Sequence, residues 1–184
     1  MSPEEIEKLR FPVGRFNPPE TLALEHIPGM IETIRQFPDE VSALINDLPI
    51  DALNWKYRPG GWSAKQVVHH CADSHMNALI RFKLALTEDE PTIRPYYEDR
   101  WAELMDSRQD DLLPSVFILG GVHRRWTQVM QSMILSDWNR GYIHPEYNRR
   151  YTLYQALGNY DWHCKHHLEH LRLAIQSNGK YNDM

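Results

Sequence analysis

Residues 60–87 read GGWSAKQVVHHCADSHMNALIRFKLALT and predict one long helix. Ser63 and Gln66 have the Ser-x-x-Gln spacing of a capping box, in which each side chain binds the backbone N–H of the other residue. Apolar residues then return to one face with the helical period, at Val68, Cys71, Ala78, Leu79 and Phe82. This helix is expected to begin at Ser63 and to end near Thr87.

Residues 151–177 read YTLYQALGNYDWHCKHHLEHLRLAIQS and predict a second long helix. Thr152 and Gln155 repeat the capping-box spacing. The apolar stripe passes through Leu153, Leu157, Tyr160, Cys164, Leu171 and Ile175. The helix is expected to end near Ser177, because Gly179 is a natural helix stop.

Two further helices and their connections complete the predicted fold. One helix spans about Thr21–Asp47, where Pro28 marks a late start and Pro38 a kink. Another spans Leu112–Leu135, with a weak point at its Gly-Gly pair. Four long helices with two long connections are typical of a bundle. The prediction is therefore an all-α four-helix bundle, with residues 1–184 as a single domain.

The segments between the helices are rich in turn-forming residues. Residues 1–20 are expected to form an extended arm, since residues 11–19 read FPVGRFNPP, with three prolines. Residues 87–111 are expected to form a long crossover loop over a pocket, with one short helix around Asp99–Met105. The polar stretch SDWNRGYIHPEYNRR, residues 136–150, is expected to be another loop.

Composition narrows the class of protein. A chain of 184 residues with 42% hydrophobic content is long enough for one sizeable core. The net charge of −5, without a dense basic run, argues against nucleic acid as a partner. No apolar run approaches the roughly 20 residues of a membrane span, and the start lacks the apolar core of a signal peptide. We therefore expect a cytoplasmic protein with no membrane partner, in which Cys71 and Cys164 are free, core-filling thiols.

The histidines of the last helix carry the main functional signal. His163 and His167 are four residues apart, so their side chains lie one above the other on one helix face. A third imidazole from another helix would complete a three-histidine metal site with an open coordination position, as catalytic sites have. Periodicity places His167 inside the apolar stripe and prefers His163 over His170 only slightly, while His166 points well away from the stripe.

The earlier helix leaves the third ligand open. Its apolar stripe is centred nearer His75 than His70, so spacing alone keeps both as candidates. An isolated histidine is more often a core or surface residue than a ligand. Seven histidines in two short helical segments make that simpler interpretation less attractive.

The chain resembles the DinB-like superfamily and, within it, the YfiT-type family of metal-dependent enzymes. The resemblance is carried by FPVGRFNPPE, GGWSAKQVVHHCADSHMNALIRFKLALTE, IRPYYEDRWAELMDS, YIHPEYNR and WHCKHHLEHL. In that family a histidine eight positions after a tryptophan and a His-x-x-x-His pair bind the metal. The resemblance therefore implies His70, His163 and His167 as ligands, against His75 and His170. It also implies a four-helix bundle with the metal at one end, usually as a homodimer.

Two kinds of chemistry are consistent with such a site. Neutral imidazoles do not neutralise the charge of the metal ion, so the ion lowers the pKa of a bound water or thiol. A bound water that ionises near pH 7 can hydrolyse a substrate. A bound thiol that ionises can attack an electrophilic carbon. The resemblance implies thiol transfer with a low-molecular-weight thiol such as bacillithiol, and hydrolysis by metal-bound hydroxide is the alternative. One divalent metal per chain is expected, with zinc as the default and nickel as a stand-in. A third possibility is a non-enzymatic module with a structural metal, although three histidines without a fourth ligand argue against it.

Several side chains are candidates for supporting roles, toward a small-molecule substrate or the ligands. Asp73 and Glu169 could orient ligand imidazoles, although exposed helix carboxylates are an equally good interpretation. Three arginines could bind an anionic thiol, and two aromatic residues could line the pocket. Ordinary surface charge and aromatic packing are the simpler interpretation of these five residues. These are Arg81, Arg94, Arg100, Tyr96 and Trp101.

Overall fold

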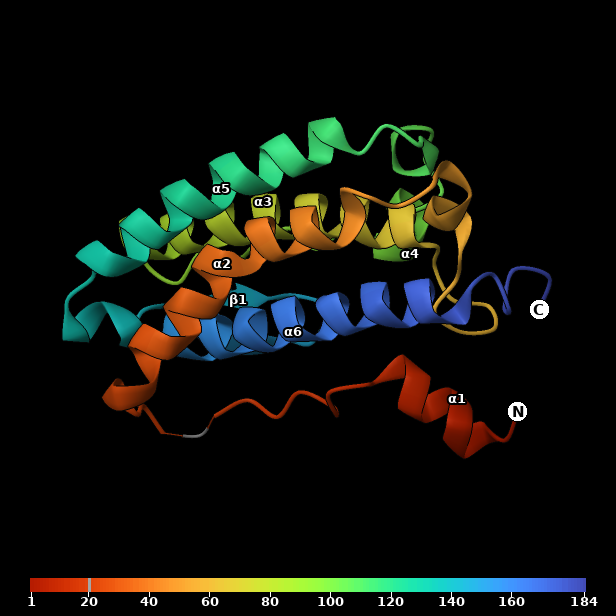
Figure 1. Ribbon diagram of the computed structural model, residues 1–184. Coiled ribbons are helices and arrows are strands. Elements are labelled where there is room, and N and C mark those ends of the chain that lie inside the picture. The colour runs from red at the N-terminus through yellow and green to blue at the C-terminus, as the bar shows by residue number, and fades with distance from the viewer. Residues whose placement is uncertain (20) are drawn as a thin grey trace.

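Figure 1 shows the computed structural model, which describes residues 1–19 and 21–184. Four long helices lie side by side: α2 (Ile27–Ile45), α3 (Ala64–Thr87), α5 (Leu113–Ser132) and α6 (Leu153–Ser177). Both α2 and α3 pack against α5 and α6, so α2 and α3 occupy opposite corners of the bundle. The predicted all-α four-helix bundle is confirmed.

The two helices that carry the candidate ligands begin where the capping boxes predicted. The Ser63 hydroxyl accepts a hydrogen bond from the backbone N–H of Gln66 at the start of α3. The Thr152 hydroxyl accepts one from the backbone N–H of Gln155 at the start of α6. Asn178 takes a left-handed conformation, with φ 48° and ψ 44°, and ends α6 one residue before Gly179. Local sequence signals therefore set the bounds of both helices.

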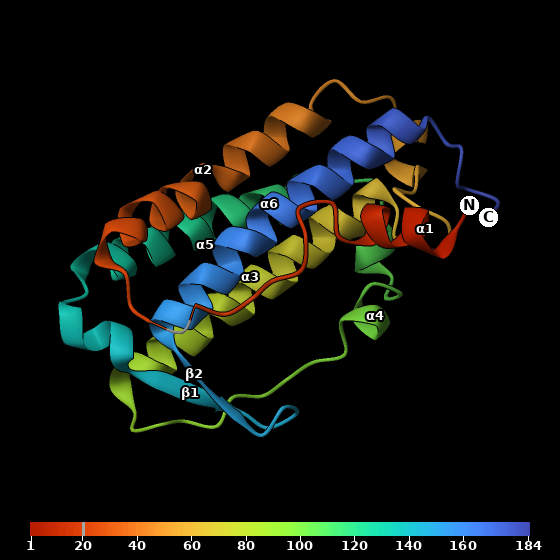
Figure 2. The ribbon, with the colours of Figure 1, turned by 90° about the horizontal axis from the view of Figure 1, so that it is seen from below.

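The N-terminal segment corrects the predicted arm. Residues 3–10 form a helix, α1 (Pro3–Arg10), which Ser2 caps through a complete capping box with Glu5. The Ser-x-x-Glu spacing of this capping box is present in the sequence, but the prolines of residues 11–19 favoured the prediction of an extended arm. The chain then runs without regular structure along α6 (Figure 2), where the Trp162 indole N–H donates to the Gly14 carbonyl at 2.9 Å. Glu20, the last residue of the predicted arm, lies outside the described residues.

Smaller differences follow from proline and glycine. The helix expected from Thr21 begins as a 3₁₀ turn at Leu24–His26, and α2 proper starts at Ile27, because Pro28 favours the first turn of a helix. Helix α2 continues through Pro38, and α5 continues through its Gly-Gly pair. Helix α5 ends at Ser132, and a 3₁₀ turn follows at Leu135–Asn139.

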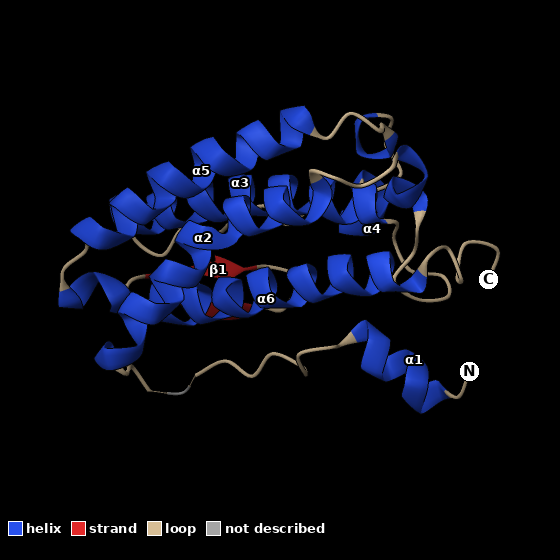
Figure 3. Ribbon diagram, in the orientation of Figure 1, coloured by secondary structure: helices blue, strands red, loops and turns tan. Residues whose placement is uncertain are grey.

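The stretch expected to be a polar loop is a β-hairpin (Figure 3). Strand β1 (Gly141–His144) pairs antiparallel with β2 (Arg149–Thr152). Tyr142 and Tyr151 lie opposite each other with ring centroids 6.1 Å apart, and such cross-strand aromatic pairs stabilise short hairpins. The crossover joins the hairpin, since the Ile93 N–H donates to the Ile143 carbonyl at 3.0 Å.

The crossover between α3 and α5 carries less helix than predicted. The helix expected at Asp99–Met105 is the short α4 (Glu98–Trp101), and a 3₁₀ turn follows at Asp106–Arg108. A further 3₁₀ turn, Ile50–Asn54, precedes α3. One continuous core fills the bundle between its four long helices. In the described ranges, every helix is too short or too polar to span a bilayer.

Candidate metal centre

The three histidines implied by the resemblance meet between two neighbouring helices. Helix α3 presents His70, and α6 presents His163 and His167, with one nitrogen of each ring within 4.8 Å of the others. The Nε2 atoms of His70 and His163 are 3.3 Å apart. Two nitrogens of a tetrahedral zinc site, each about 2.0–2.1 Å from the ion, are separated by roughly 3.3 Å. The spacing therefore fits a first-row transition metal.

The electrostatics of the site also fit a metal. Burial lowers the pKa of His70 to about 4 and the pKa of His163 and of His167 well below the ordinary histidine value. The rings are therefore neutral, which is the form that binds metal. His70 and His167 are buried, whereas His163 is partly exposed. A set of imidazoles without carboxylates suits zinc, nickel or copper rather than calcium or magnesium.

A second group of histidines lies on the same helix. His166, His167 and His170 also place ring nitrogens within 4.8 Å of one another. This group shares His167 with the first, and all its members belong to α6. Because the first group joins α3 to α6 and includes a partly exposed ligand, it is the better candidate for a catalytic centre.

His166 is buried, which the sequence pattern did not predict. Its side chain was expected to point away from the apolar stripe, yet the residue is only 7% exposed. Its ring stacks on Trp162 at 4.3 Å and lies 5.9 Å from Phe11, measured between ring centroids. The N-terminal segment covers this face of α6, which the periodicity of α6 alone does not reveal.

His75, the rival third ligand, lies behind His163. Its Nε2 is 2.9 Å from Nδ1 of His163, on the side of the ring opposite the nitrogen that faces His70. Its Nδ1 is 2.6 Å from Nε2 of His123, a fully buried residue of α5. The metal-site pattern in the sequence did not include His123, although its position between Leu119 and Trp126 on the apolar face of α5 was a usable signal.

The carboxylates proposed to orient the ligands do not do so in this structure. Glu169 instead accepts a hydrogen bond from Arg172 at 2.6 Å. Asp73 is partly buried, and burial raises its pKa to about 6. Within residues 1–19 and 21–184, neither carboxylate forms a hydrogen bond with a ligand imidazole. Histidines occupy that position instead.

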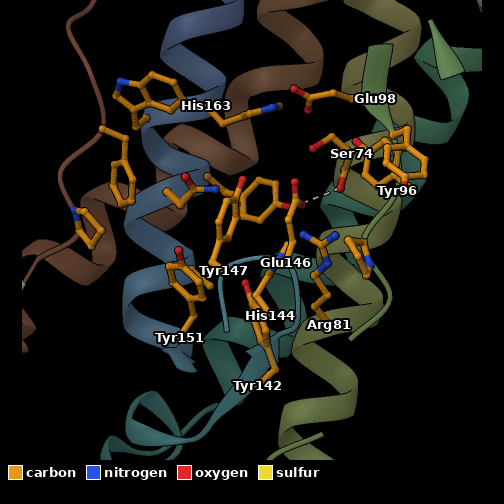
Figure 4. A pocket seen from close by; sticks show the side chains of 18 of the residues that line it. Ser74, Arg81, Tyr96, Glu98, Tyr142, His144, Glu146, Tyr147, Tyr151 and His163 are labelled. Carbon is orange, nitrogen blue, oxygen red and sulfur yellow. Dashed lines mark hydrogen bonds between the residues drawn. The ribbon is translucent and has the colours of Figure 1, made fainter. Parts of the chain in front are cut away.

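A cavity of about 710 Å³ adjoins the centre (Figure 4). His163 lines it from α6, Ser74 and Arg81 line it from α3, and the hairpin closes the opposite side with Tyr142 and His144. The Nε atom of Arg81 is buried without a hydrogen-bond partner among the described residues. Of the other predicted pocket residues, Tyr96 and Arg100 line the cavity. Trp101 lies outside the cavity and packs on Tyr96, with ring centroids 4.5 Å apart. Arg94 is not among the described residues that line the cavity.

Known proteins of the same fold resemble this chain along most of its length. A family model described as the DinB superfamily matches residues 33–171. The chain belongs to the DinB superfamily. A solved structure, described as "YfiT from Bacillus subtilis is a probable metal-dependent hydrolase with an unusual four-helix bundle topology", superposes with a TM-score of 0.90 at 39% identity. The match covers 94% of this chain and 98% of that one.

Several named relatives also match most of this chain. The protein named "Putative metal-dependent hydrolase YfiT" of Bacillus subtilis (strain 168) is 40% identical over 163 residues, 89% of this chain and 92% of that protein. Proteins named "Putative metal-dependent hydrolase" from Bacillus pumilus (strain SAFR-032) and Bacillus cereus (strain 03BB102) are 41% and 44% identical. The matches cover 94% and 90% of this chain and 98% and 95% of those proteins.

The two cysteines of this DinB-superfamily chain lie in the core. Cys71 and Cys164 are both fully buried and unpaired, and burial raises the pKa of both thiols. In the described part of the chain, neither joins a histidine group that could hold a metal. Neither therefore closes the centre as a fourth ligand, and the chain offers no reactive thiol of its own at the cavity.

Proposed function

We propose that this protein is a metal-dependent enzyme in which His70, His163 and His167 hold one divalent transition metal, zinc first and nickel second. The observation that carries the proposal is the convergence of three neutral imidazoles, one of which, His163, lines a cavity large enough for a small molecule. Three protein ligands leave one position of a tetrahedral site open. When bound there, a metal ion acts as a Lewis acid that lowers the pKa of water or a thiol.

The cavity residues indicate what kind of molecule is bound. Arg81 offers a buried Nε–H that has no hydrogen-bond partner among the described residues, and a carboxylate or another anionic group of the substrate can accept from it. Aromatic side chains, among them Tyr142 and Tyr160, form apolar walls. The hairpin and the crossover both contribute to the cavity wall. We therefore propose a substrate, or co-substrate, with an anionic end and an apolar part.

Transfer of a low-molecular-weight thiol is the first candidate reaction. The cavity volume of about 710 Å³ has room for a thiol and an electrophile together. Because both cysteines of the chain are buried, the thiol has to come from a small molecule. In the reaction the thiol loses its proton to solvent, its sulfur forms a bond to the electrophilic carbon, and the leaving group departs with the bonding electron pair.

Hydrolysis is the second candidate, and the names of the relatives favour it. It requires the same open position, with water in place of the thiol. The same Arg81 would then hold the substrate of the hydrolysis rather than a thiol co-substrate.

The deciding experiment compares the two nucleophiles on metal-loaded protein purified without a histidine tag. Monochlorobimane is offered with bacillithiol, glutathione, cysteine or no thiol, with and without chelator. Metal-dependent conjugation that requires one thiol, with release of chloride, establishes thiol transfer. Absence of conjugation with all three thiols rejects it, and a panel of esters and amides then tests hydrolysis.

Ligand variants separate an enzyme from a structural metal module. In an enzyme, His70→Ala abolishes turnover and leaves the metal-free fold largely intact. If the metal is structural, the same variant lowers the melting temperature strongly and no substrate of either panel reacts.

A further inference from the structure

A chain of buried histidines runs from the backbone of α2 to the candidate ligand His163. Nδ1 of His123 lies 2.5 Å from the carbonyl oxygen of Ile34. Nε2 of His123 lies 2.6 Å from Nδ1 of His75, and Nε2 of His75 lies 2.9 Å from Nδ1 of His163. His75 and His123 are at most 1% exposed, and Phe37 packs against both rings. The three contacts join α2, α5, α3 and α6.

The proton positions along this chain follow from its anchored end. A carbonyl oxygen can only accept, so Nδ1 of His123 carries the hydrogen. A neutral imidazole has one N–H, so Nε2 of His123 accepts, and the hydrogen between the next two rings belongs to Nδ1 of His75. By the same rule Nε2 of His75 accepts from Nδ1 of His163. Nε2 of His163 is left with a free lone pair that faces His70.

The count of one proton per ring is supported by the surroundings. His75 and His123 lie in the core, and burial lowers the pKa of His123 to about 4. A positive charge on either His75 or His123, whose ring nitrogens are 2.6 Å apart, would be costly in this apolar interior.

A shorter chain acts on the neighbouring ligand. Nε2 of His170 lies 3.2 Å from the carbonyl oxygen of Arg10, at the end of α1, so this nitrogen donates. Nδ1 of His170 therefore accepts, and it faces Nδ1 of His167 at 3.4 Å. The contact between His170 and His167 is longer than the contacts of His75, but it leaves His167 with a free Nε2 in the same way.

We infer that His75 and His123 are positioning residues that hold His163 in its Nδ1-protonated tautomer, so that its Nε2 is always available to the metal. Metal-binding histidines commonly donate their other ring N–H to a carboxylate, a backbone carbonyl or water. Here His75 is the acceptor for His163. His123 fixes the tautomer of His75, because its own Nδ1–H donates to the backbone carbonyl of Ile34. The effect on metal affinity rests on the proposed metal function, whereas the tautomer is a property of the metal-free protein.

Two substitutions of His75 test the inference. His75→Leu keeps a similar volume and removes the acceptor for His163. His75→Gln provides a carboxamide oxygen that can accept from His163 and an NH₂ group that can donate to His123. The matched control is His69→Leu on the same helix. His69 is also buried, but its ring bonds to Ser115 Oγ at 2.8 Å and to the Gln109 carbonyl at 3.0 Å, away from the centre.

Two measurements report on each protein. Long-range ¹H–¹⁵N NMR of the metal-free protein assigns the protonated nitrogen of His163. Competition with a chromophoric chelator gives the dissociation constant for zinc. We expect Nδ1–H in the wild type, zinc binding weakened about 10- to 100-fold in His75→Leu, most of that loss recovered in His75→Gln, and binding unchanged in His69→Leu.

Either of two results overturns the inference. One is a wild-type spectrum in which Nε2 of His163 carries the proton, and this measurement needs no variant to fold. The other is a folded His75→Leu protein that binds zinc as tightly as the wild type. If the wild type binds no metal while Nδ1 of His163 is protonated, the proposed function fails and the tautomer assignment is upheld.

Discussion

Removing one ligand should abolish the stabilisation of the fold by zinc. His70→Ala is the informative change, because it deletes one ligand and leaves intact the series of histidine hydrogen bonds that ends at His163. Zinc at about 100 times its dissociation constant stabilises a folded protein by roughly 2.7 kcal/mol if the unfolded chain does not bind it. For a domain of this size, 1 kcal/mol corresponds to about 2–4 °C, so zinc should raise the melting temperature by roughly 5–11 °C.

The variant itself should remain folded. His70 is 5% exposed and packs on Trp62 with ring centroids 4.6 Å apart, so truncation costs packing of about 1–3 kcal/mol. The variant also loses the contact between Nε2 of His70 and Nε2 of His163, which are 3.3 Å apart. Differential scanning calorimetry with zinc and with chelator measures both effects.

His166→Ala is the matched control, since it belongs only to the second group of histidines. We expect it to keep the zinc-dependent shift that His70→Ala loses. The opposite pattern, with the shift lost in His166→Ala and kept in His70→Ala, would refute the assignment and move the metal to His166, His167 and His170.

Further predictions concern the cavity, the pH dependence, the hairpin and the assembly. Arg81→Met should lower kcat/KM for an anionic substrate by roughly 10- to 150-fold, as for a lost charged hydrogen bond of about 1.5–3 kcal/mol, and should leave zinc affinity unchanged by chelator competition. The pKa of His123 is lower in the folded than in the unfolded state, so the unfolded chain binds more protons between about pH 4 and 6.5. The metal-free protein should therefore lose stability in urea titrations as the pH falls through this window, and His123→Leu should flatten that decline. Gly141→Ala should destabilise the fold by about 1–3 kcal/mol, because a Cβ there would clash with the Tyr151 carbonyl, whereas Gly120→Ala in exposed α5 should stabilise it by about 0.5–1 kcal/mol. The homodimer implied by the family resemblance predicts a sedimentation mass of about twice 21.8 kDa, and a monomer at all concentrations would contradict it.

The sequence by itself determined the four long helices and the spacing of the histidines on the last of them. Ser63 with Gln66 and Thr152 with Gln155 are neighbours along the chain, so their hydrogen bonds form wherever those segments fold. The pairing of His163 with His167 also follows from helix geometry alone. Family resemblance added His70, which the structure places beside them.

Only the tertiary structure placed His70 beside His163 and His167, with His75 behind them, and revealed His123. Helix α3 is covered by α5 on one side and α6 on another, so both histidines are buried and a single apolar stripe cannot distinguish them. The same holds for His166, which the N-terminal segment covers. Spacing along one helix is set by the local backbone, whereas a contact between α2, α3, α5 and α6 depends on how four separate elements pack, and no local pattern records that packing.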